Sequence, residues 1–572
     1  MLKTTKRNTP KQLIGLLCGI LVLSACAGGQ IGIRNSVEYR NGMVVSAKQQ
    51  ASQVGIDILK KGGNAVDAGI AVQFALAVVY PNAGNIGGGG FMVYRSASGE
   101  TNTLDFREKA ASGASRDMYL DGAGNPITDK SLHGSLAAGV PGTVAGMVAA
   151  HQKYGKLKWA DLLEPAIALA NDGFAISEKQ AKELNGLHDM FMKLNPNGTA
   201  LLKASGKWMP GDKLVQYELA NTLTQIRDKG RAGFYEGAVA DSIVAEMQRD
   251  GGLITKTDLK NYQAIWRKPI TGNYKGYKVI TMPPPSSGGI ALVQLLKSVE
   301  PFPLHRWGFN TDSTVQVIVE AERRVYADRA AHLGDPDFVH VPAAQLMNDQ
   351  YVKNRMATFN FNQATTSASV SAGEIAPAEH EETTHYSIVD RDGNAVSITT
   401  TLNGSYGAGV AVKGAGFLLN NEMDDFSVKP GSPNMYGLVG GEANAIAPGK
   451  RMLSSMTPTI VEKDGKLFMV VGTPGGSTII TSVFQTILNV IEFEKSMQSA
   501  VNAKKFHHQW LPDEVMAEDE ALDSLTQVRL KAKGYKITQR GQIGRVDAIL
   551  KTQWGYYQGG ADPRGDDKAI GW

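Results

Sequence analysis

The chain has 572 residues, of which 42% are hydrophobic and 20% are charged, a composition typical of a soluble globular protein with a large buried core. Its formal net charge is +4 at pH 7, but the first 25 residues hold four basic and no acidic side chains. Without that segment the chain is close to neutral, so its charge gives no support for nucleic-acid binding.

The N-terminal segment is predicted to be an export signal. An apolar run at residues 13–23 follows four basic residues, Lys3, Lys6, Arg7 and Lys11. This run has the length of a signal-peptide core and is shorter than a membrane span. The next residues, Leu-Ser-Ala-Cys ending at Cys26, resemble a bacterial lipobox, in which the cysteine is lipidated and becomes the mature N-terminus.

We therefore expect residues 1–25 to be removed and the exported, periplasmic protein to be held by a lipid on Cys26. Ala27 favours the outer membrane, because the lipoprotein pattern reserves aspartate at that place for the inner membrane. The alternative is cleavage after a small residue and release as a soluble protein. Cys18 would leave with the signal, so the mature chain could form no internal disulfide and no cysteine-type zinc site.

The first half of the mature chain is predicted to be mainly helical. Residues 46–80 show helical spacing in two segments separated by Gly62–Gly63, and Asp67 and Gln73 within the second segment favour a buried helix over a membrane span. The glycine-rich loop at residues 84–90 lacks the Gly-Lys-Ser/Thr ending of a phosphate-binding loop, so we expect a tight turn before a strand. Further helices are expected within 159–176, with Gly173 as the cap, across 214–265, and as a long amphipathic helix at 314–332.

Strands are predicted after an irregular segment. Residues 358–382 have little periodicity and many small side chains, which indicates an exposed, flexible stretch. Two hairpins follow, each with an Asp-Gly turn, one joining His385–Val389 to Ala395–Leu402 and one joining Thr457–Glu462 to Leu467–Val471. With a helix at 479–493, the pattern predicts an α/β fold layered helix, sheet, sheet, helix.

Several common catalytic patterns are absent from the sequence. The pentapeptide Asn-Gly-Ser-Tyr-Gly at 403–407 lacks the first glycine of a serine-hydrolase elbow. His507 and His508 are adjacent, so their side chains point in different directions and do not form a metal pair. We expect these histidines to be structural, and the sequence implies no metal and no cofactor.

Thr383 and Thr384 stand where the irregular segment meets a strand. Threonine suits strands, so a purely structural role is one interpretation. The other is that the chain is cut before Thr383, because a freed α-amine with a pKa of about 7.7–8.0 can act as the base that a threonine hydroxyl needs.

Longer motifs decide between these interpretations. The stretch TTHYSIVDRDGNAVSITTTLN, from Thr383, strongly resembles the start of the small subunit of γ-glutamyltransferases, which are N-terminal nucleophile hydrolases. Other blocks resemble the same family in the same order and cover nearly the whole mature chain, among them GGNAVDAGIAVQFALAVVYPNAGNIGGGGFMVYR, LDFREKA, RRVYADRAAHLGDPDF, NNEMDDFS, RMLSSMTPTIV and GTPGGS. The chain is identified as a member of this family.

The resemblance implies a four-layer αββα fold and a precursor that cuts itself between Glu382 and Thr383. Residues 26–382 would form the large subunit and residues 383–572 the small, catalytic subunit, intertwined in one domain as a heterodimer. Thr383 would be the nucleophile of both maturation and catalysis, Thr401 would orient its hydroxyl, and the amides of Gly475 and Gly476 would form the oxyanion hole.

The resemblance also implies a substrate, glutathione or a related γ-glutamyl compound, whose acyl group passes to water or to an amino acid or peptide amine. The α-carboxylate of the donor would bind Arg107, Ser454 and Ser455, and its α-ammonium would bind Asn403, Glu422 and Asp425; Tyr436 matches a residue of a lid loop over the pocket. Glu422 departs from the glutamine that is frequent in bacterial members, which leaves the charge of the pocket and the donor preference open.

Two other functions remain as alternatives. One is an acylase of the same fold that removes glutaryl side chains from cephalosporins, whose substrates lack the ammonium that Glu422 and Asp425 would bind. The other is a non-enzymatic envelope lipoprotein that uses the fold as a binding scaffold, in which case the purified chain would be intact.

Overall fold

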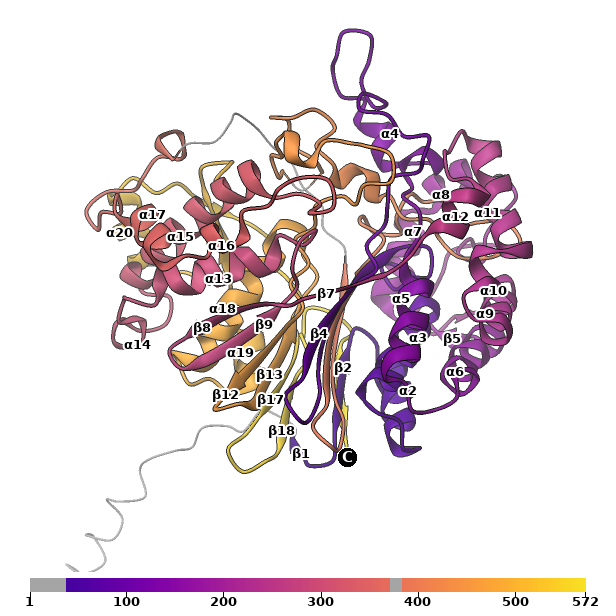
Figure 1. Ribbon diagram of the computed structural model, residues 1–572, viewed down its shortest axis with the longest axis horizontal. Helices are drawn as coiled ribbons and strands as arrows, with labels where there is room; N and C mark the ends of the chain where they lie inside the picture. The colour runs from indigo at the N-terminus through magenta and orange to yellow at the C-terminus, as the bar shows by residue number, and fades with distance from the viewer. Residues whose placement is uncertain (1–37, 371–382, 436) are drawn as a thin grey trace, which may run out of the picture. The chain divides into compact units, whose positions relative to one another are not determined.

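Figure 1 shows the computed structural model of the chain, which describes residues 38–370, 383–435 and 437–572. The described residues all belong to one compact unit, Ser36–Trp572. Three parts of the sequence predictions lie outside the described residues: the export signal at 1–25 with Cys26, residues 371–382 with Glu382, and Tyr436.

Two seven-stranded antiparallel sheets stack face to face in the centre of this unit (Figure 1). In hydrogen-bonded order, the first sheet contains β1 (Glu38–Tyr39), β18 (Tyr557–Gly560), β17 (Asp547–Lys551), β13 (Lys466–Gly472), β12 (Thr459–Lys463), β9 (Tyr277–Thr281) and β8 (Ile270–Tyr274). The second contains β19 (Lys568–Gly571), β2 (Met43–Ser46), β10 (Thr384–Val389), β11 (Ala395–Thr401), β3 (Gly89–Arg95), β4 (Thr101–Asp105) and β7 (Ile265–Arg267).

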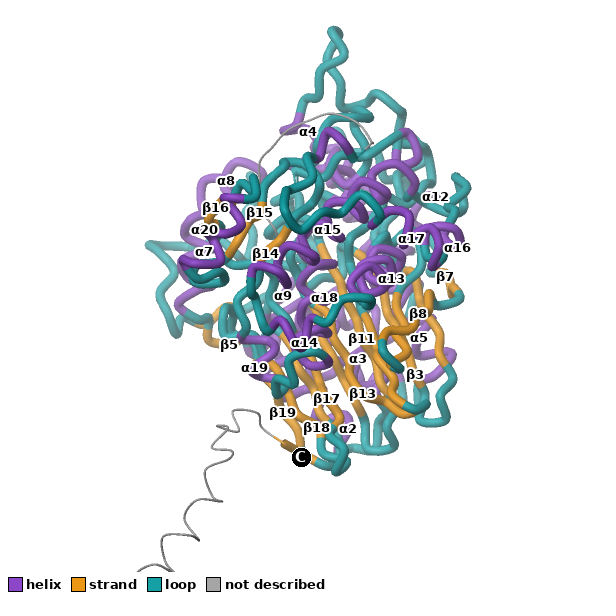
Figure 2. The backbone as a smooth tube through the Cα atoms, turned by 90° about the vertical axis from the view of Figure 1, so that its left-hand side faces the viewer, coloured by secondary structure: helices purple, strands orange, loops and turns teal. Residues whose placement is uncertain are grey.

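Helices cover the outer face of each sheet, as Figures 1 and 2 show. The second sheet packs against α2 (Gln49–Lys60), α3 (Ala65–Val79) and α5 (Thr143–Tyr154), with α6 (Trp159–Asp172) and α9 (Tyr217–Lys229) beyond them. The first sheet packs against α13 (Gly288–Val299), α18 (Ile479–Ile491) and α19 (Met497–Asn502), and α15 (Asp312–His332) lies on α13. The predicted layering of helix, sheet, sheet and helix is thus confirmed.

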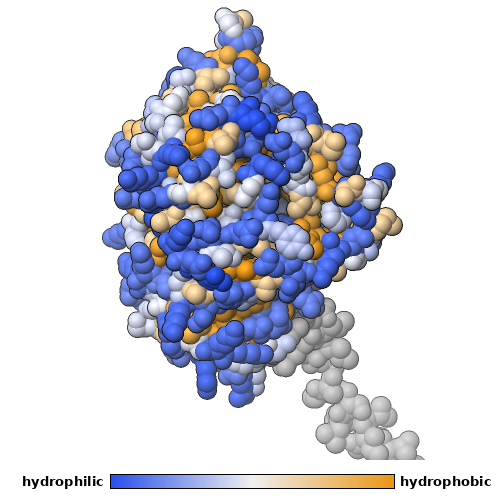
Figure 3. Space-filling view, turned by 90° about the vertical axis from the view of Figure 1, so that its right-hand side faces the viewer, coloured by the Kyte–Doolittle hydropathy of each residue, from blue (hydrophilic) through white to orange (hydrophobic). Residues whose placement is uncertain are grey.

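The remaining elements are short or lie around the helical layers. They are α4 (Thr128–Leu132), α7 (Glu178–Gly186), α8 (His188–Leu194), α10 (Ala232–Tyr235), α11 (Gly237–Asp250), α12 (Lys256–Asn261), α14 (Leu304–Trp307), α16 (Ala343–Leu346), α17 (Asp349–Met356), α20 (Ser524–Ala532), β5 (Phe174–Ala175), β6 (Lys213–Leu214), β14 (Phe506–His507), β15 (Val515–Ala517) and β16 (Ile537–Gln539). The face formed by α8 to α12 carries mostly hydrophilic side chains, with apolar ones in small separate groups (Figure 3).

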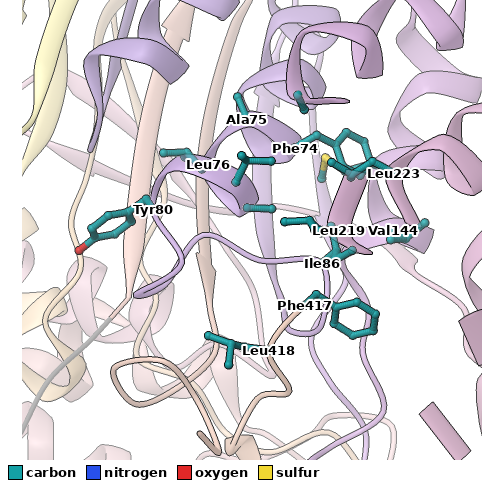
Figure 4. Packing of buried hydrophobic residues seen from close by; sticks show 14 of the residues in the cluster. Phe74, Ala75, Leu76, Tyr80, Ile86, Val144, Leu219, Leu223, Phe417 and Leu418 are labelled. Carbon is teal, nitrogen blue, oxygen red and sulfur yellow. The ribbon is translucent and has the colours of Figure 1, made fainter. Parts of the chain in front are cut away.

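Helix α3 is buried on all sides, as the sequence predicted. The side chain of Asn64 caps its first turn by accepting the backbone N–H groups of Val66 and Asp67, each at 2.9 Å. Phe74 and Leu76 point into a core that also contains Leu219 of α9 (Figure 4), and each such side chain stabilises the fold by about 1.5–3 kcal/mol. Within the described part of the chain, no helix is long and apolar enough to cross a membrane.

The hairpin of β10 and β11 also matches the prediction. Three successive backbone N–H groups, of Asp392, Gly393 and Asn394, donate to Oδ1 of Asp390 and close the turn. Gly393 has φ 92°, a conformation that favours glycine. The hairpin lies in the middle of the second sheet, between β2 and β3, so its backbone is fixed on both sides.

Helix α15 differs from its prediction as an amphipathic helix. Every residue from Thr314 to Ala330 is buried, including its charged ones. Its charged groups have partners within the helix and on other segments: Arg324 pairs with Glu320 of α15 itself, Arg323 contacts Asp513, and Asp328 pairs with Arg355. The charged pattern resembles a solvated face because two of these partners, Asp513 and Arg355, lie outside the helix.

The irregular segment before Thr383 is largely exposed over its described part, residues 358–370. Ser367 is an exception, since its N–H donates to Asp513 at 2.7 Å and its hydroxyl donates to the carbonyl of Trp510. Both sheets contain strands that precede residue 383 and strands that follow it, hydrogen-bonded to each other. A cut at that point would therefore leave two pieces that share both sheets.

Candidate active site

Thr383 lies directly before β10, at the open end of the hairpin, and is 4% exposed. Thr384 pairs with Thr400 across the hairpin, so Thr383 and Thr401 are neighbours at its end. Their Oγ1 atoms are 3.5 Å apart, and Oγ1 of Thr401 accepts the N–H of Asn403 at 2.7 Å. These contacts hold the hydroxyl of Thr383 in one orientation.

A polar pocket opens at this hydroxyl. It is lined by nine of the residues predicted for the site, namely Arg107, Thr383, Thr401, Asn403, Glu422, Asp425, Ser454, Ser455 and Gly476. The structure thus brings together side chains from segments more than 300 residues apart in the sequence. The segment on either side of Tyr436 also reaches the pocket, through Asn434 and Leu438.

The two predicted oxyanion-hole glycines stand at the start of a helical segment. Gly475 has φ 137° and Gly476 has φ 49°, and the turn Gly476–Thr478 leads directly into α18. Backbone N–H groups at such a start have no partner within the helix and can donate to an anion. The loop is held in place because Tyr326 of α15 donates to the carbonyl of Ser477, and Thr478 donates through its hydroxyl to the carbonyl of Gly475 at 2.8 Å.

Arg107 is fully buried and is in direct contact with acids of the pocket. Its Nη1 pairs with Glu422, its Nη2 pairs with Asp425, and Nη1 lies 3.6 Å from Oε2 of Glu108. Burial opposes the charge of Arg107, but these carboxylates together raise the pKa of its guanidinium. The sequence predicts that Arg107 binds the α-carboxylate of the donor and that the two acids bind its α-ammonium. In the structure, Arg107 and these acids pair with each other.

The acids around Arg107 are hard to ionise. Burial raises the pKa of Glu108 to about 7, although the charge of Arg107 opposes the shift. Burial likewise raises the pKa of Glu422 well above its ordinary value, and that of Asp425, again against the charge of Arg107. Neither carboxylate oxygen of Glu108 has a hydrogen-bond partner among the described residues. Three carboxyl groups thus compete for one guanidinium.

Ser454 and Ser455 form another part of the pocket wall. The hydroxyl of Ser454 accepts the N–H of Met456 at 3.1 Å, and the hydroxyl of Ser455 accepts Nη2 of Arg329 at 3.1 Å. Arg329 lines the pocket and was missed from the sequence, although it lies within the block RRVYADRAAHLGDPDF. A charged side chain on a helix is usually exposed to solvent. The feature of the sequence that could have indicated a buried Arg329 is that this helix carries charged residues on all of its faces.

One further residue of the pocket, Asn434, was missed. Asn434 donates to Oδ1 of Asp425 at 3.1 Å, and so connects the segment before Tyr436 to the acids. Asp424 does not line the pocket; it accepts the N–H of Met435 at 2.9 Å and the hydroxyl of Ser131 at 2.7 Å. Of the two neighbouring aspartates, Asp425 is the one in the pocket, as predicted.

The histidines that the sequence assigned to structure are buried away from the pocket. Nδ1 of His507 lies 2.8 Å from the hydroxyl of Thr481, and Nδ1 of His508 accepts the N–H of Trp510 at 3.1 Å. Burial lowers the pKa of His507 to about 3 and that of His508 to about 4, so both are neutral at pH 7. Across the described ranges, no group of three or more His, Cys, Asp or Glu residues is placed to hold a metal ion.

A buried threonine at the open end of a hairpin, between two antiparallel sheets that helices cover on both sides, is the arrangement of an N-terminal nucleophile hydrolase. The sequence profile of the gamma-glutamyltranspeptidase family matches residues 51–572. The chain belongs to this family.

Known relatives agree with this assignment. The glutathione hydrolase proenzyme of Escherichia coli is 48% identical over 547 residues, which cover 95% of this chain and 94% of the relative. The crystal structure of Helicobacter pylori gamma-glutamyltranspeptidase matches with 44% identity and a TM-score of 0.56, over 60% of this chain and 99% of the other. The cephalosporin acylase of Bacillus halodurans matches with 27% identity and a TM-score of 0.83, over 95% and 98% of the two chains.

Proposed function

We propose that Thr383 first cuts the chain and then carries γ-glutamyl groups from glutathione and related donors to water or to an amine. The chain is a γ-glutamyltransferase and glutathione hydrolase, in agreement with its family and its relatives. The observation that carries the proposal for the site is that the hydroxyl of Thr383 opens into a pocket with both a guanidinium, Arg107, and carboxyl groups, Glu422 and Asp425. A γ-glutamyl group carries the two matching charges.

Maturation begins with attack of the Thr383 hydroxyl on the carbonyl carbon of Glu382. The peptide C–N bond breaks as the new C–O bond forms, so that the carbonyl is held as an ester on Thr383 and its amine is freed. Water then hydrolyses the ester and releases residues 26–382 as the large subunit. Both sheets contain strands from both sides of the cut, which supports a heterodimer in which the large subunit stays assembled with the small subunit, residues 383–572.

Catalysis uses the amine that the cut uncovers. An α-amine with a pKa of about 7.7–8.0 is partly neutral at pH 7 and can take the proton of the Thr383 hydroxyl. The oxygen attacks the γ-carbonyl of the donor, and the N–H groups of Gly475 and Gly476 would stabilise the oxyanion that forms. The amine returns its proton to the leaving amino group, and cysteinylglycine departs from glutathione. Water or an acceptor amine then attacks the acyl-enzyme by the reverse sequence of steps.

The donor would enter between the charges of the pocket. Its α-ammonium would take the place of Arg107 beside Glu422 and Asp425 and bind Asn403, while its α-carboxylate would bind Arg107, Ser454 and Ser455. Because one ion pair is replaced by two, neither Arg107 nor the two acids are left without a partner. Fixing both ends of the amino acid places the γ-carbonyl at Thr383, so that binding energy is used for orientation.

The alternatives fit the pocket less well. A glutaryl donor has no ammonium, so Glu422 and Asp425 would gain no partner when it binds. A purely binding protein would have no use for a hydroxyl held by Thr401 beside a glycine loop at the start of a helix.

Export and anchoring are a separate part of the proposal. The basic and apolar N-terminal segment supports export to the periplasm, and the lipobox supports a lipid on Cys26. Cys26→Ala should move the protein from the membrane fraction to the soluble periplasmic fraction. Unchanged membrane retention would contradict the anchor.

Maturation is tested by Thr383→Ala, which should give a single inactive chain on a denaturing gel. Thr384→Ala is the matched control, because its hydroxyl is buried without a hydrogen-bond partner among the described residues and it does not line the pocket. The control should still give two subunits that release glutamate from glutathione. Two bands from the Thr383→Ala protein would overturn the maturation route.

A further inference from the structure

Arg329 is a buried cation on the wall of the active-site pocket. It lies near the end of α15 and is 5% exposed. Its Nε donates to the hydroxyl of Ser287 at 2.9 Å and its Nη2 donates to the hydroxyl of Ser455 at 3.1 Å. Among the residues that the structure describes, no carboxylate lies within ion-pairing distance of it.

The partners of Arg329 are therefore neutral hydroxyl groups, which is unusual for a buried guanidinium. Burial lowers its pKa, and electrostatic interactions with Tyr326 and Asp425 oppose this shift without outweighing it. Arg324, on the same helix, shows the ordinary arrangement, since it pairs with Glu320 at 2.5 Å. Arg329 is thus held in place by weak partners and faces the pocket with an uncompensated charge.

The acids around Arg107 indicate why the pocket needs a second cation. Glu108, Glu422 and Asp425 surround a single guanidinium, Arg107, whose Nη1 and Nη2 are both occupied by these acids. Without Arg329, the only guanidinium among the residues that line this pocket would be Arg107, which the acids already occupy. Arg329 adds a second guanidinium that no carboxylate holds and that can attract the α-carboxylate of a donor.

We propose that Arg329 is a second residue that binds the α-carboxylate of the γ-glutamyl donor, together with Ser455. This inference rests on the proposed function and adds to it. Arg107 must give up its contacts with Glu422 and Asp425 to bind the carboxylate, whereas Arg329 gives up only contacts with neutral hydroxyl groups. Ser287 acts as a positioning residue, because it accepts Nε of Arg329 and donates to the carbonyl of Ser454 at 2.7 Å.

The alternative is that Arg329 only holds α15 against the loop at 454–455. The two roles predict different effects of an Arg329 substitution on activity with different donors. A structural role would lower activity with every donor by the same factor. A carboxylate-binding role would lower activity only with donors that carry the carboxylate.

Three anilides separate these outcomes. The γ-glutamyl-p-nitroanilide carries both charges, glutaryl-p-nitroanilide lacks the ammonium, and 4-aminobutanoyl-p-nitroanilide lacks the carboxylate. For Arg329→Met we expect kcat/KM to fall about 10- to 100-fold with the first two donors and to change less than about twofold with the third. As competitive inhibitors of the γ-glutamyl donor, glutarate and 4-aminobutyrate should show the same difference. The substitution should raise the inhibition constant of glutarate and leave that of 4-aminobutyrate nearly unchanged.

Control variants make the comparison specific. Arg324→Met removes a buried guanidinium from the same helix outside the pocket, and it should leave the ratio between the three donors unchanged even if stability falls. Arg329→Lys keeps the charge and should recover part of the loss. If Arg329→Met does not mature, Ser287→Ala provides the same comparison in milder form.

Equal losses with all three donors, or no loss, would overturn the proposal. Failure of the proposed function would be seen separately, as a wild-type protein that does not hydrolyse γ-glutamyl-p-nitroanilide.

Discussion

Asp425→Asn is the substitution that tests recognition of the donor ammonium most sharply. The variant keeps the shape of the side chain but removes its charge. In the structure Asp425 contacts Nη2 of Arg107 and accepts Nδ2 of Asn434 at 3.1 Å, so the amide can keep one of these contacts. The change is therefore mainly one of charge.

Its magnitude follows from the electrostatics of the pocket. Two unit charges about 4 Å apart attract each other by roughly 4 kcal/mol at the effective dielectric constant of about 20 that suits such sites. Arg107 already offsets part of the charge of Asp425, so we expect a loss of about 2–4 kcal/mol for a donor with an ammonium. This corresponds to a fall in kcat/KM of about 30- to 1,000-fold.

The assay compares initial rates with γ-glutamyl-p-nitroanilide and glutaryl-p-nitroanilide. The second donor has no ammonium, so its kcat/KM should stay within about threefold of the wild-type value. Asp424→Asn is the matched control: it removes a neighbouring buried charge that binds Ser131 and Met435 outside the pocket lining, and it should affect both donors equally. Equal losses with both donors for Asp425→Asn would refute the assignment of Asp425 to the ammonium.

Two predictions concern pH. Burial raises the pKa of Glu108 to about 7, so its negative charge grows as the pH rises through 7. Because Glu108 lies 3.6 Å from Nη1 of Arg107, this charge competes with the α-carboxylate of the donor, and KM for γ-glutamyl donors should rise between pH 6 and 8. Glu108→Gln should flatten that rise, and an unchanged profile in the variant would exclude Glu108 as its source. Burial lowers the pKa of His385 and His507 to about 3 and of His508 to about 4, so below pH 6.5 the unfolded chain binds protons that the folded chain does not. The free energy of unfolding should therefore fall with decreasing pH by about 1.4 kcal/mol per pH unit for each histidine. Urea titrations at pH 7 and pH 5 should show a smaller fall for His508→Gln than for the wild type. An identical fall in both proteins would contradict the buried neutral state of His508.

The elements that the sequence predicted best are those with a local physical signal. The hairpin of β10 and β11 follows from alternating side chains around an Asp-Gly turn, and α3 follows from helical spacing in an apolar run that begins after Gly62–Gly63. Both signals act within about 20 residues of the chain. The family motifs then identified the residues that the structure places around Thr383.

The parts that sequence could not predict depend on contacts between distant segments. The pairing of Arg107 with Glu422 joins residues 315 positions apart, and no local pattern contains it. Helix α15 looks solvated because its charges suggest water, whereas its partners come from residues 355 and 513. Arg329 was overlooked for the same reason, since its place in the pocket depends on how α15 packs.

N-terminal sequencing of the purified protein, combined with a glutathione hydrolysis assay on the same sample, tests the central claim most directly. The account predicts an active preparation in which one subunit begins Thr-Thr-His-Tyr-Ser, with Thr383 as its free N-terminus. Full hydrolysis of glutathione by a chain in which Glu382 is still joined to Thr383 would contradict it.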